Sequence, residues 1–281
     1  SLLNDVNFIV CPLEGAKFEV DDDRLDVFFA FTDRYGRNIN VKVNENRKPR
    51  KKPFFLLAPI GTLAKQPKSF PVYSLYGMSF AKQKNTVIEI KVDETMHKPD
   101  TFPLPVDWAK NYFSHYSPDT FNVDWNKNFQ GRLLPLFPGE DGKTVNGNVS
   151  YELNNNQGHH EIRRMSTANR KHTINIEFQP PVPDIVCLRD GLKMTGEFII
   201  TTDGAAGSVR GQYHALRRGN ETEMSLHPDR GWIPNEKRLI LRLLFMVVKV
   251  FKDWPKSYEW NAVIDSGYPN NPIMDSSWKR I

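Results

Sequence analysis

Alternating apolar and polar positions recur along the chain and predict a protein built mainly from antiparallel strands. Within residues 37–45, Ile39, Val41 and Val43 alternate with polar side chains, which is the two-residue period of a half-buried strand. The preceding run, 25–32, is rich in aromatic and β-branched residues, and the short loop DRYG between the two runs predicts a hairpin. Further strands are predicted in segments 85–94, 147–153, 171–178, 191–202 and 207–218.

One segment, 236–252, departs from this pattern and predicts a helix. At about 100° per residue four basic side chains, Arg238, Arg242, Lys249 and Lys252, fall on a single narrow stripe, and apolar side chains cover most of the remaining surface. The pattern therefore predicts one long helix near the C-terminus that is buried on most sides and ends at Pro255. The alternative, a helix lying on a membrane surface, calls for a broader basic face. Residues 106–115 predict a second, shorter helix after Pro105.

The length of 281 residues suits two domains of average size. The segment 137–148 contains several glycines and has no apolar periodicity, so it is the predicted linker. We therefore predict an N-terminal β-rich domain over 1–138 and a C-terminal β-rich domain over 147–281, each a barrel or a sandwich. This mainly β arrangement resembles that of two-domain lipocalin-like proteins in architecture. No motif accompanies the resemblance, so it assigns no residue a role.

Composition and charge narrow the possible partners. With 39% hydrophobic residues the chain can form a real core, and its net charge of +5 is only mildly basic. The densest basic run, 46–52, has no aromatic side chain among its charges, as stacking on single-stranded nucleic acid requires. Nucleic acid is therefore not an expected partner. An alternative function remains, in which a non-catalytic interaction or structural protein contacts an acidic partner through such basic loops.

Signals for membrane insertion, secretion and cofactor binding are weak or missing. The first residues lack a basic region and carry Asp5 within the apolar run, which makes a poor signal peptide. The longest uncharged apolar run, 53–64, is shorter than the roughly 18 residues that a membrane span needs. The Gly-rich segment 201–211 lacks the ending of a phosphate-binding loop. We expect no transmembrane segment, no cofactor and a cytoplasmic location.

The histidines and cysteines do not predict a metal site. His159 and His160 are adjacent, so in a strand their side chains point to opposite faces and cannot share an ion. Cys11 and Cys187 lie far apart and cannot form a zinc knuckle by themselves. We therefore expect no bound metal.

The same region suggests an acid/base site. If residues 167–170 (TANR) form a tight turn, Glu161 and Arg163 are expected to face His172 and Ile174 across a hairpin. A carboxylate orients and charges an imidazole, so His172, Glu161 and Arg163 are the candidate catalytic residues. The alternative is an exposed ladder of charges between the strands.

Two further sets of residues suggest a binding pocket. Arg210, Gln212 and His214 are predicted to share one strand face, which is either the wall of a polar cavity or solvent-exposed. Tyr258 and Trp260 are predicted to share a face that is either a ligand pocket or core. Together these features suggest that the protein binds an apolar or aromatic small molecule in a barrel or between domains. Whether it also performs cofactor-free acid/base chemistry, as an isomerase, cyclase or hydratase does, stays open.

Overall fold

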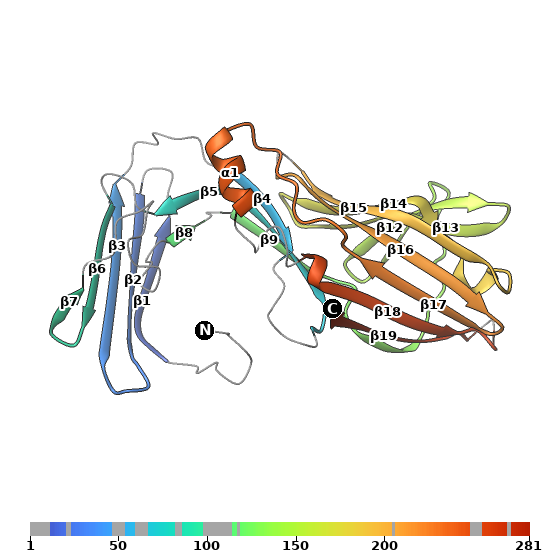
Figure 1. Cartoon of the computed structure of the whole chain (residues 1–281), viewed down its shortest axis with the longest axis horizontal. Coiled ribbons are helices and arrows are strands. Elements are labelled where there is room, and N and C mark those ends of the chain that lie inside the picture. Colours follow the sequence, from blue (N-terminus) through green and yellow to red (C-terminus); the bar gives the residue numbers. More distant parts are fainter. Residues whose placement is uncertain are drawn as a thin grey trace. The chain divides into compact units, whose positions relative to one another are not determined.

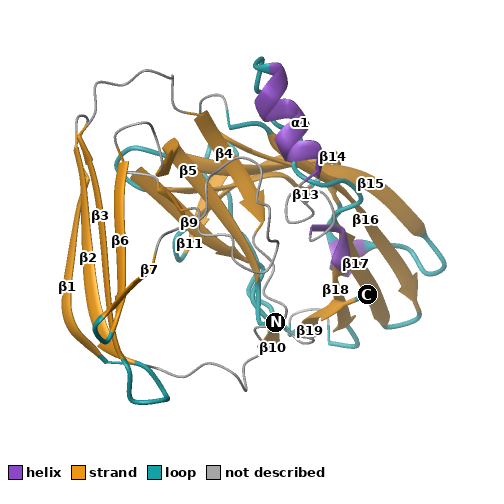
Figure 2. Ribbon diagram, turned by 60° about the vertical axis from the view of Figure 1, so that its left-hand side comes forward, coloured by secondary structure: helices purple, strands orange, loops and turns teal. Residues whose placement is uncertain are grey.

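The computed structural model describes residues 12–20, 24–46, 54–59, 67–81, 86–97, 114–116, 119–203, 206–247, 255–268 and 271–281. Antiparallel strands make up most of this part of the chain (Figure 2). The one α-helix within these ranges is α1 (Leu239–Val247). The mainly β, antiparallel fold that the alternating pattern predicts is therefore confirmed.

The chain divides into two compact units whose boundaries differ from the predicted ones. The first comprises residues 1–54 and 76–119, and the second comprises 55–75 and 120–281. The predicted boundary between 1–138 and 147–281 therefore falls inside the second unit.

The predicted linker contains a strand, β11 (Lys143–Asn146), which pairs with β12 (Val149–Asn156). Its glycines form the turns around β11. Gly147 has a φ of 63°, a left-handed conformation that glycine adopts without strain, in the hairpin between β11 and β12. The glycines of this segment therefore belong to hairpin turns and not to a linker. The sequence did not separate the two, because turns and linkers share the same composition.

The first unit contains a five-stranded sheet in the order β1-β2-β3-β6-β7. Its strands are β1 (Leu13–Val20), β2 (Arg24–Thr32), β3 (Asn38–Asn46), β6 (Thr86–Val92) and β7 (Thr95–His97). The predicted hairpin between β2 and β3 is confirmed. The Asp33 carboxylate closes its loop by accepting hydrogen bonds from the backbone of Tyr35 and Arg37, at 2.8 and 3.0 Å. Leu25 and Val43 form the buried centre of this sheet.

A second sheet has the order β4-β5-β8, and β9 also pairs with β5. Its strands are β4 (Phe54–Pro59), β5 (Phe70–Ala81), β8 (Ser114–Tyr116) and β9 (Asp119–Trp125). Most of the helix predicted over 106–115 lies outside the described residues, and its last two residues, Ser114 and His115, belong to β8. All of the basic run 46–52 except Asn46, the last residue of β3, also lies outside them.

The second unit is dominated by a ten-stranded antiparallel sheet in the order β10-β19-β18-β17-β16-β15-β14-β13-β12-β11 (Figure 1). The strands not yet given are β10 (Phe129–Arg132), β13 (His159–Ala168), β14 (Thr173–Val182), β15 (Lys193–Thr202), β16 (Ser208–Arg218), β17 (Glu221–His227), β18 (Tyr258–Asp265) and β19 (Ile273–Arg280). From β11 to β19 each strand pairs with the next. Because β10 and β11 remain separate edges, this sheet is not the closed barrel that was one of the predicted architectures.

The ten-stranded sheet has an apolar face and a polar face. On β14, Ile174, Ile176 and Phe178 are buried on the apolar face, and the side chains between them point to the polar face. The second-unit part of β5 covers some of the apolar face, because the ring of Phe70 stacks on Trp278 with 5.0 Å between ring centroids. Removing this apolar area from water is the main favourable term in the stability of the unit.

Helix α1 differs from its prediction in where it begins and in burial. It begins at Leu239 and is described to Val247, so the described residues contain no long helix, and residues 248–252 of the predicted helix lie outside them. Phe245 is buried edge-on against Trp232, but four apolar side chains are exposed: Leu239, Ile240, Leu243 and Met246. The prediction of burial on most sides is wrong, because a periodic pattern shows which residues share a face but not whether another element covers it. No helix within the described residues is long and apolar enough to cross a membrane.

An ion pair precedes α1 and predicts a dependence of stability on acid pH. The Arg238 guanidinium lies 2.7 Å from Glu236 Oε2, and the Arg238 backbone N–H donates to Glu236 Oε1 at 2.9 Å. The hydrogen bond from the Arg238 side chain lowers the pKa of Glu236 from its ordinary 4.5 to about 2. Because the folded-state pKa is depressed, the pair stabilises the fold above pH 4.5, and this contribution is lost as the pH falls toward 2.

We expect Glu236→Gln to lower the free energy of unfolding at pH 7 by about 1 kcal/mol, since exposed ion pairs contribute at most about that much. The loss relative to the native chain should shrink between pH 4.5 and 2, where the native carboxylate becomes protonated. Urea unfolding measured at several pH values tests this. A difference between the two proteins that does not change with pH would contradict it.

Candidate functional site

A row of charged side chains crosses four neighbouring strands on the polar face of the ten-stranded sheet. The strand registers place Lys143, Glu152, Arg164 and Glu177 side by side on β11 to β14. Glu152 Oε1 lies 3.3 Å from Arg164 Nη1 and 4.0 Å from Lys143 Nζ, and Arg164 also contacts Glu177. Neighbouring charges alternate in sign, so the row links the four strands. A cross-strand charge ladder was the alternative interpretation of this region, although its members differ from those predicted.

Next to this row the polar face is hollowed over four consecutive strands, β13 to β16. The hollow has a volume of about 330 Å³. Its lining residues are three arginines, two glutamates, a glutamine and three apolar residues: Arg163, Arg164, Arg210, Glu177, Glu197, Gln179, Phe178, Phe198 and Ile199. The rings of Phe178 and Phe198 point to the apolar face of the sheet, so Ile199 is the apolar residue whose side chain shares the polar face with Arg210.

An irregularity between β13 and β14 accounts for the position of the hollow. Arg164 pairs with Glu177, but Ile162 pairs with Val182, so β14 has more residues than β13 between these two pairs. The extra segment contains Pro180 and Pro181, which have no N–H group to donate to a neighbouring strand.

Tyr213, on β16, forms hydrogen bonds to this extra segment of β14 past the intervening strand β15. Its hydroxyl donates to the carbonyl of Pro180 at 2.8 Å, with the carbonyl of Pro181 at 3.0 Å. Burial, and to a lesser extent the charge of Glu161, raises the pKa of Tyr213 to about 12. The hydroxyl therefore remains a neutral donor at physiological pH.

Arg210 and Glu197 are the charged groups of the hollow that remain available to a ligand. Among the described residues no carboxylate lies within ion-pair distance of the Arg210 guanidinium, and the Glu197 carboxylate accepts no hydrogen bond. Arg164 and Glu177, in contrast, already contact each other. A guanidinium matches the geometry of a carboxylate or phosphate, and a free carboxylate accepts from a hydroxyl or an amine. In the hollow, Arg210 can thus bind an acid group of a ligand, and Glu197 can accept a hydrogen bond from a hydroxyl or amine of the ligand.

The predicted acid/base cluster of His172, Glu161 and Arg163 is not formed. The hairpin between β13 and β14 pairs Ala168 with Thr173, so Glu161 lies seven residues, or roughly 23 Å, further along β13. A hairpin pairs residues that are equally distant from its turn. His172, inside the turn, therefore cannot face Glu161.

Each member of that predicted cluster contacts a different residue. His172 Nδ1 lies 3.1 Å from Asp203 Oδ2. Glu161 accepts a hydrogen bond from the Asn156 side chain at 2.9 Å. Arg163 lies 2.5 Å from Glu152 and is the one member that lines the hollow.

The predicted binding residues are divided between the two faces of the sheet. Arg210, Gln212 and His214 share the polar face of β16, as predicted, but of these three only Arg210 lines the hollow. Tyr258 and Trp260 share the apolar face of β18 and are 3% and 4% exposed, so they are core residues. The alternative reading of these aromatic residues as core is therefore the correct one.

Sequence reasoning missed Arg164 and the two glutamates of the hollow. Glu177 and Glu197 each precede a phenylalanine, in the dipeptides 177–178 and 197–198, and the two phenylalanines pair across β14 and β15. The repeated Glu-Phe dipeptide in two predicted strands was the available signal. The repeated dipeptide became informative only when the strand register placed its two phenylalanines opposite each other on β14 and β15.

One group of described residues outside the hollow has the donor atoms of a metal site: His159, Asp184 and Cys187. The thiol does not have the properties of a catalytic nucleophile. Desolvation by the surrounding protein, and then the neighbouring Asp184 carboxylate, raise the pKa of the exposed Cys187 thiol above its ordinary value, which disfavours the reactive thiolate.

Comparison of the chain with protein-family models, with curated proteins and with solved structures found no match. Its function is therefore inferred from the geometry of these residues.

Proposed function

We propose that the protein binds a small aromatic or apolar molecule that carries an acid group, in the hollow between β13 and β16. The observation that carries this proposal is the Arg210 guanidinium, which has no carboxylate partner among the described residues and lines the hollow opposite Ile199. A cation left without a partner beside an apolar side chain suits a ligand that combines a negative charge with an apolar body.

Each lining residue has a defined part in this proposal. Arg210 takes the acid group through two parallel hydrogen bonds, and the side chain of Ile199, opposite Arg210 on β15, contacts the apolar body. Glu197 lies one cross-strand row away from Arg210, between Gln179 and Gln212, and accepts a hydrogen bond from a hydroxyl or amine of the ligand. The volume of about 330 Å³ is at the lower end of ligand pockets, which fits a molecule with one or two rings.

Several expectations from the sequence stay predictions. The lipocalin-like two-domain architecture stays a prediction: the ten-stranded sheet is an antiparallel meander, as in such proteins, but it is open. Acid/base chemistry without a cofactor has Glu197 as its available carboxylate, in place of the residues first expected. The cytoplasmic location, and the alternative of an acidic partner bound by basic loops, also stay predictions.

We expect Arg210→Gln to weaken binding of aromatic carboxylates at least about tenfold, since a hydrogen bond to a charged group contributes roughly 1.5–3 kcal/mol. Isothermal titration calorimetry with a panel of benzoate, phenylacetate and indole-acetate derivatives measures this. The corresponding primary amides serve as neutral ligands of the same shape. They should bind the native protein more weakly than the acids and should distinguish little between native protein and variant.

Arg218→Gln is the matched control, because Arg218 lies on the same face of β16 but outside the hollow, and its side chain is 68% exposed. It should bind the acids as the native protein does. Equal binding of acids and amides, no acid binding at millimolar concentration, or equal losses in both arginine variants would each contradict the proposed function.

A further inference from the structure

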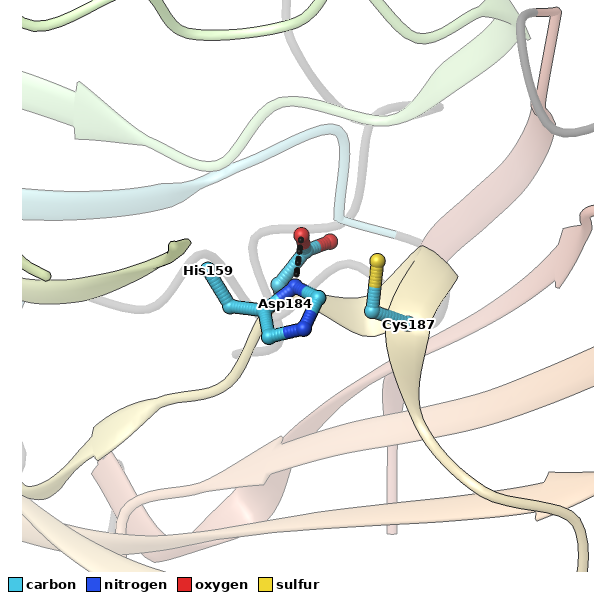
Figure 3. A group of neighbouring side chains, drawn as sticks. All are labelled: His159, Asp184 and Cys187. Carbon is cyan, nitrogen blue, oxygen red and sulfur yellow. Dashed lines mark ion pairs between the residues drawn. The ribbon is translucent and has the colours of Figure 1, made fainter. Parts of the chain in front are cut away.

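His159, Asp184 and Cys187 converge at one end of the hairpin between β12 and β13. Their three donor atoms, a ring nitrogen, a carboxylate oxygen and the sulfur, lie within 4.8 Å of one another (Figure 3). His159 Nδ1 is 3.6 Å from Asp184 Oδ2. Zinc–ligand bonds of roughly 2.0–2.3 Å place tetrahedral donor atoms about 3.3–3.8 Å apart, so one pair already has the required spacing and the sulfur needs only a small adjustment.

The local structure places the two halves of this group independently. Gln157 and Gly158 form the turn before His159, with φ values of 54° and 92°, and this two-residue turn pairs His159 with Asn156. The pairing of Ile162 with Val182 then brings the residues after β14 alongside the start of β13.

Asp184 and Cys187 come from a single short 3₁₀ turn. Asp184 caps the helix η3 (Ile185–Cys187), and the Cys187 backbone N–H donates to the Asp184 carbonyl at 3.1 Å. In a 3₁₀ turn, side chains three residues apart lie on the same side. The Val186 backbone N–H donates to Asp184 Oδ1 at 3.3 Å, so Oδ1 is held by the backbone while Oδ2 faces His159. A ligand held in this way is already oriented for a metal ion.

We propose that His159, Asp184 and Cys187 bind a divalent transition-metal ion of the zinc class, with one coordination position open to solvent. A thiolate and a carboxylate side by side are compensated by a doubly charged cation, and sulfur and imidazole donors favour zinc over magnesium or calcium. The side chains of His159 and Cys187 are exposed, so an ion has access from solvent. None of the three residues lines the hollow, and the proposal therefore does not rest on the proposed function.

This inference replaces the expectation of no metal. That expectation considered His159 only with its sequence neighbour His160 and considered Cys187 only with Cys11. The tertiary structure instead joins His159 to a cysteine 28 positions later, since 187 − 159 = 28.

Cobalt titration of the full chain after treatment with a chelator tests the proposal. Co²⁺ takes the same ligands as Zn²⁺ and gives a thiolate-to-metal charge-transfer absorption when sulfur is bound. We expect one equivalent of Co²⁺ per chain, with that absorption, and displacement by Zn²⁺. Cys187→Ser should abolish the absorption, and both Cys187→Ser and His159→Gln should weaken binding at least about tenfold.

His160→Gln and Cys11→Ser are the matched controls, and both should retain the absorption and the affinity. Circular dichroism checks that every variant folds. A second measurement uses the native chain alone: Zn²⁺ should slow alkylation of Cys187 by iodoacetamide and leave the rate at Cys11 unchanged. Failure of the native chain to bind one equivalent, unchanged binding by Cys187→Ser, or equal alkylation with and without Zn²⁺ would overturn the proposal.

Discussion

Tyr213→Ala is expected to lower the free energy of unfolding by about 3–5 kcal/mol, the range for removing a buried aromatic ring. Tyr213 is 0% exposed, and its ring packs edge-on against Phe178 with 5.9 Å between centroids. The ring also lies directly over Gly196, where an added Cβ would be 2.4 Å from it. From β16 the side chain therefore spans β15 and reaches the irregular end of β14. Urea unfolding followed by tryptophan fluorescence measures the loss.

Tyr213→Phe separates the hydroxyl from the ring. It keeps the packing but leaves the carbonyls of Pro180 and Pro181 without their donor, which should cost about 1–2 kcal/mol. The pKa of Tyr213 is raised to about 12, so its contribution to stability is present below pH 10 and is lost as the pH rises toward 12. Tyr213→Phe should lack this part of the alkaline loss. A change below about 1 kcal/mol for Tyr213→Ala would show that the ring does not hold this region.

Gly211→Ala is expected to lower the free energy of unfolding by about 3 kcal/mol, at the upper end for overfilling a packed site. An added Cβ would lie 2.3 Å from the Phe198 ring and 2.5 Å from the His227 carbonyl oxygen. The ring can shift, but the carbonyl belongs to the backbone of β17 and moves only if β16 and β17 separate.

Gly219→Ala is the control for this prediction. Gly219 lies in the turn between β16 and β17, has a φ of 56°, and has no atom within 4 Å of an added Cβ. The expected loss in the free energy of unfolding for Gly219→Ala is therefore only the cost of placing an alanine in the left-handed conformation, about 1–2 kcal/mol. Thermal and urea unfolding of both variants give the comparison. Losses of equal size would mean that close packing at Gly211 contributes nothing beyond the ordinary cost of replacing a glycine.

The proposed hollow and the proposed metal site can be tested separately, because they share no residue. Arg210→Gln should leave cobalt binding unchanged, and Cys187→Ser should leave binding of the carboxylates unchanged. If either substitution abolished both cobalt binding and carboxylate binding, it would have disrupted the fold and not a single binding site.

The sequence by itself determined the strands and the faces of their side chains. Arg210 and Gln212 were predicted on one face of β16 and Gly211 and Tyr213 on the other, and the structure has them so. The hairpin between β2 and β3 was likewise predicted with its loop. These features follow from neighbouring residues alone, because side chains alternate along a strand and a short loop limits how its two flanks pair.

Only the tertiary structure decided which strands lie beside one another and in which register. The pairing of Ala168 with Thr173 begins the register that separates His172 from Glu161 and places Arg164 beside Glu177, and the extra residues around Pro180 and Pro181 shift the pairing only beyond Arg164. It also decided that the ten-stranded sheet stays open and that one face of α1 is exposed. The physical reason is the same in each case. A local sequence pattern shows how polar each position is. The strand register, and whether another element covers a given face, depend on bulges and on contacts between residues distant in sequence.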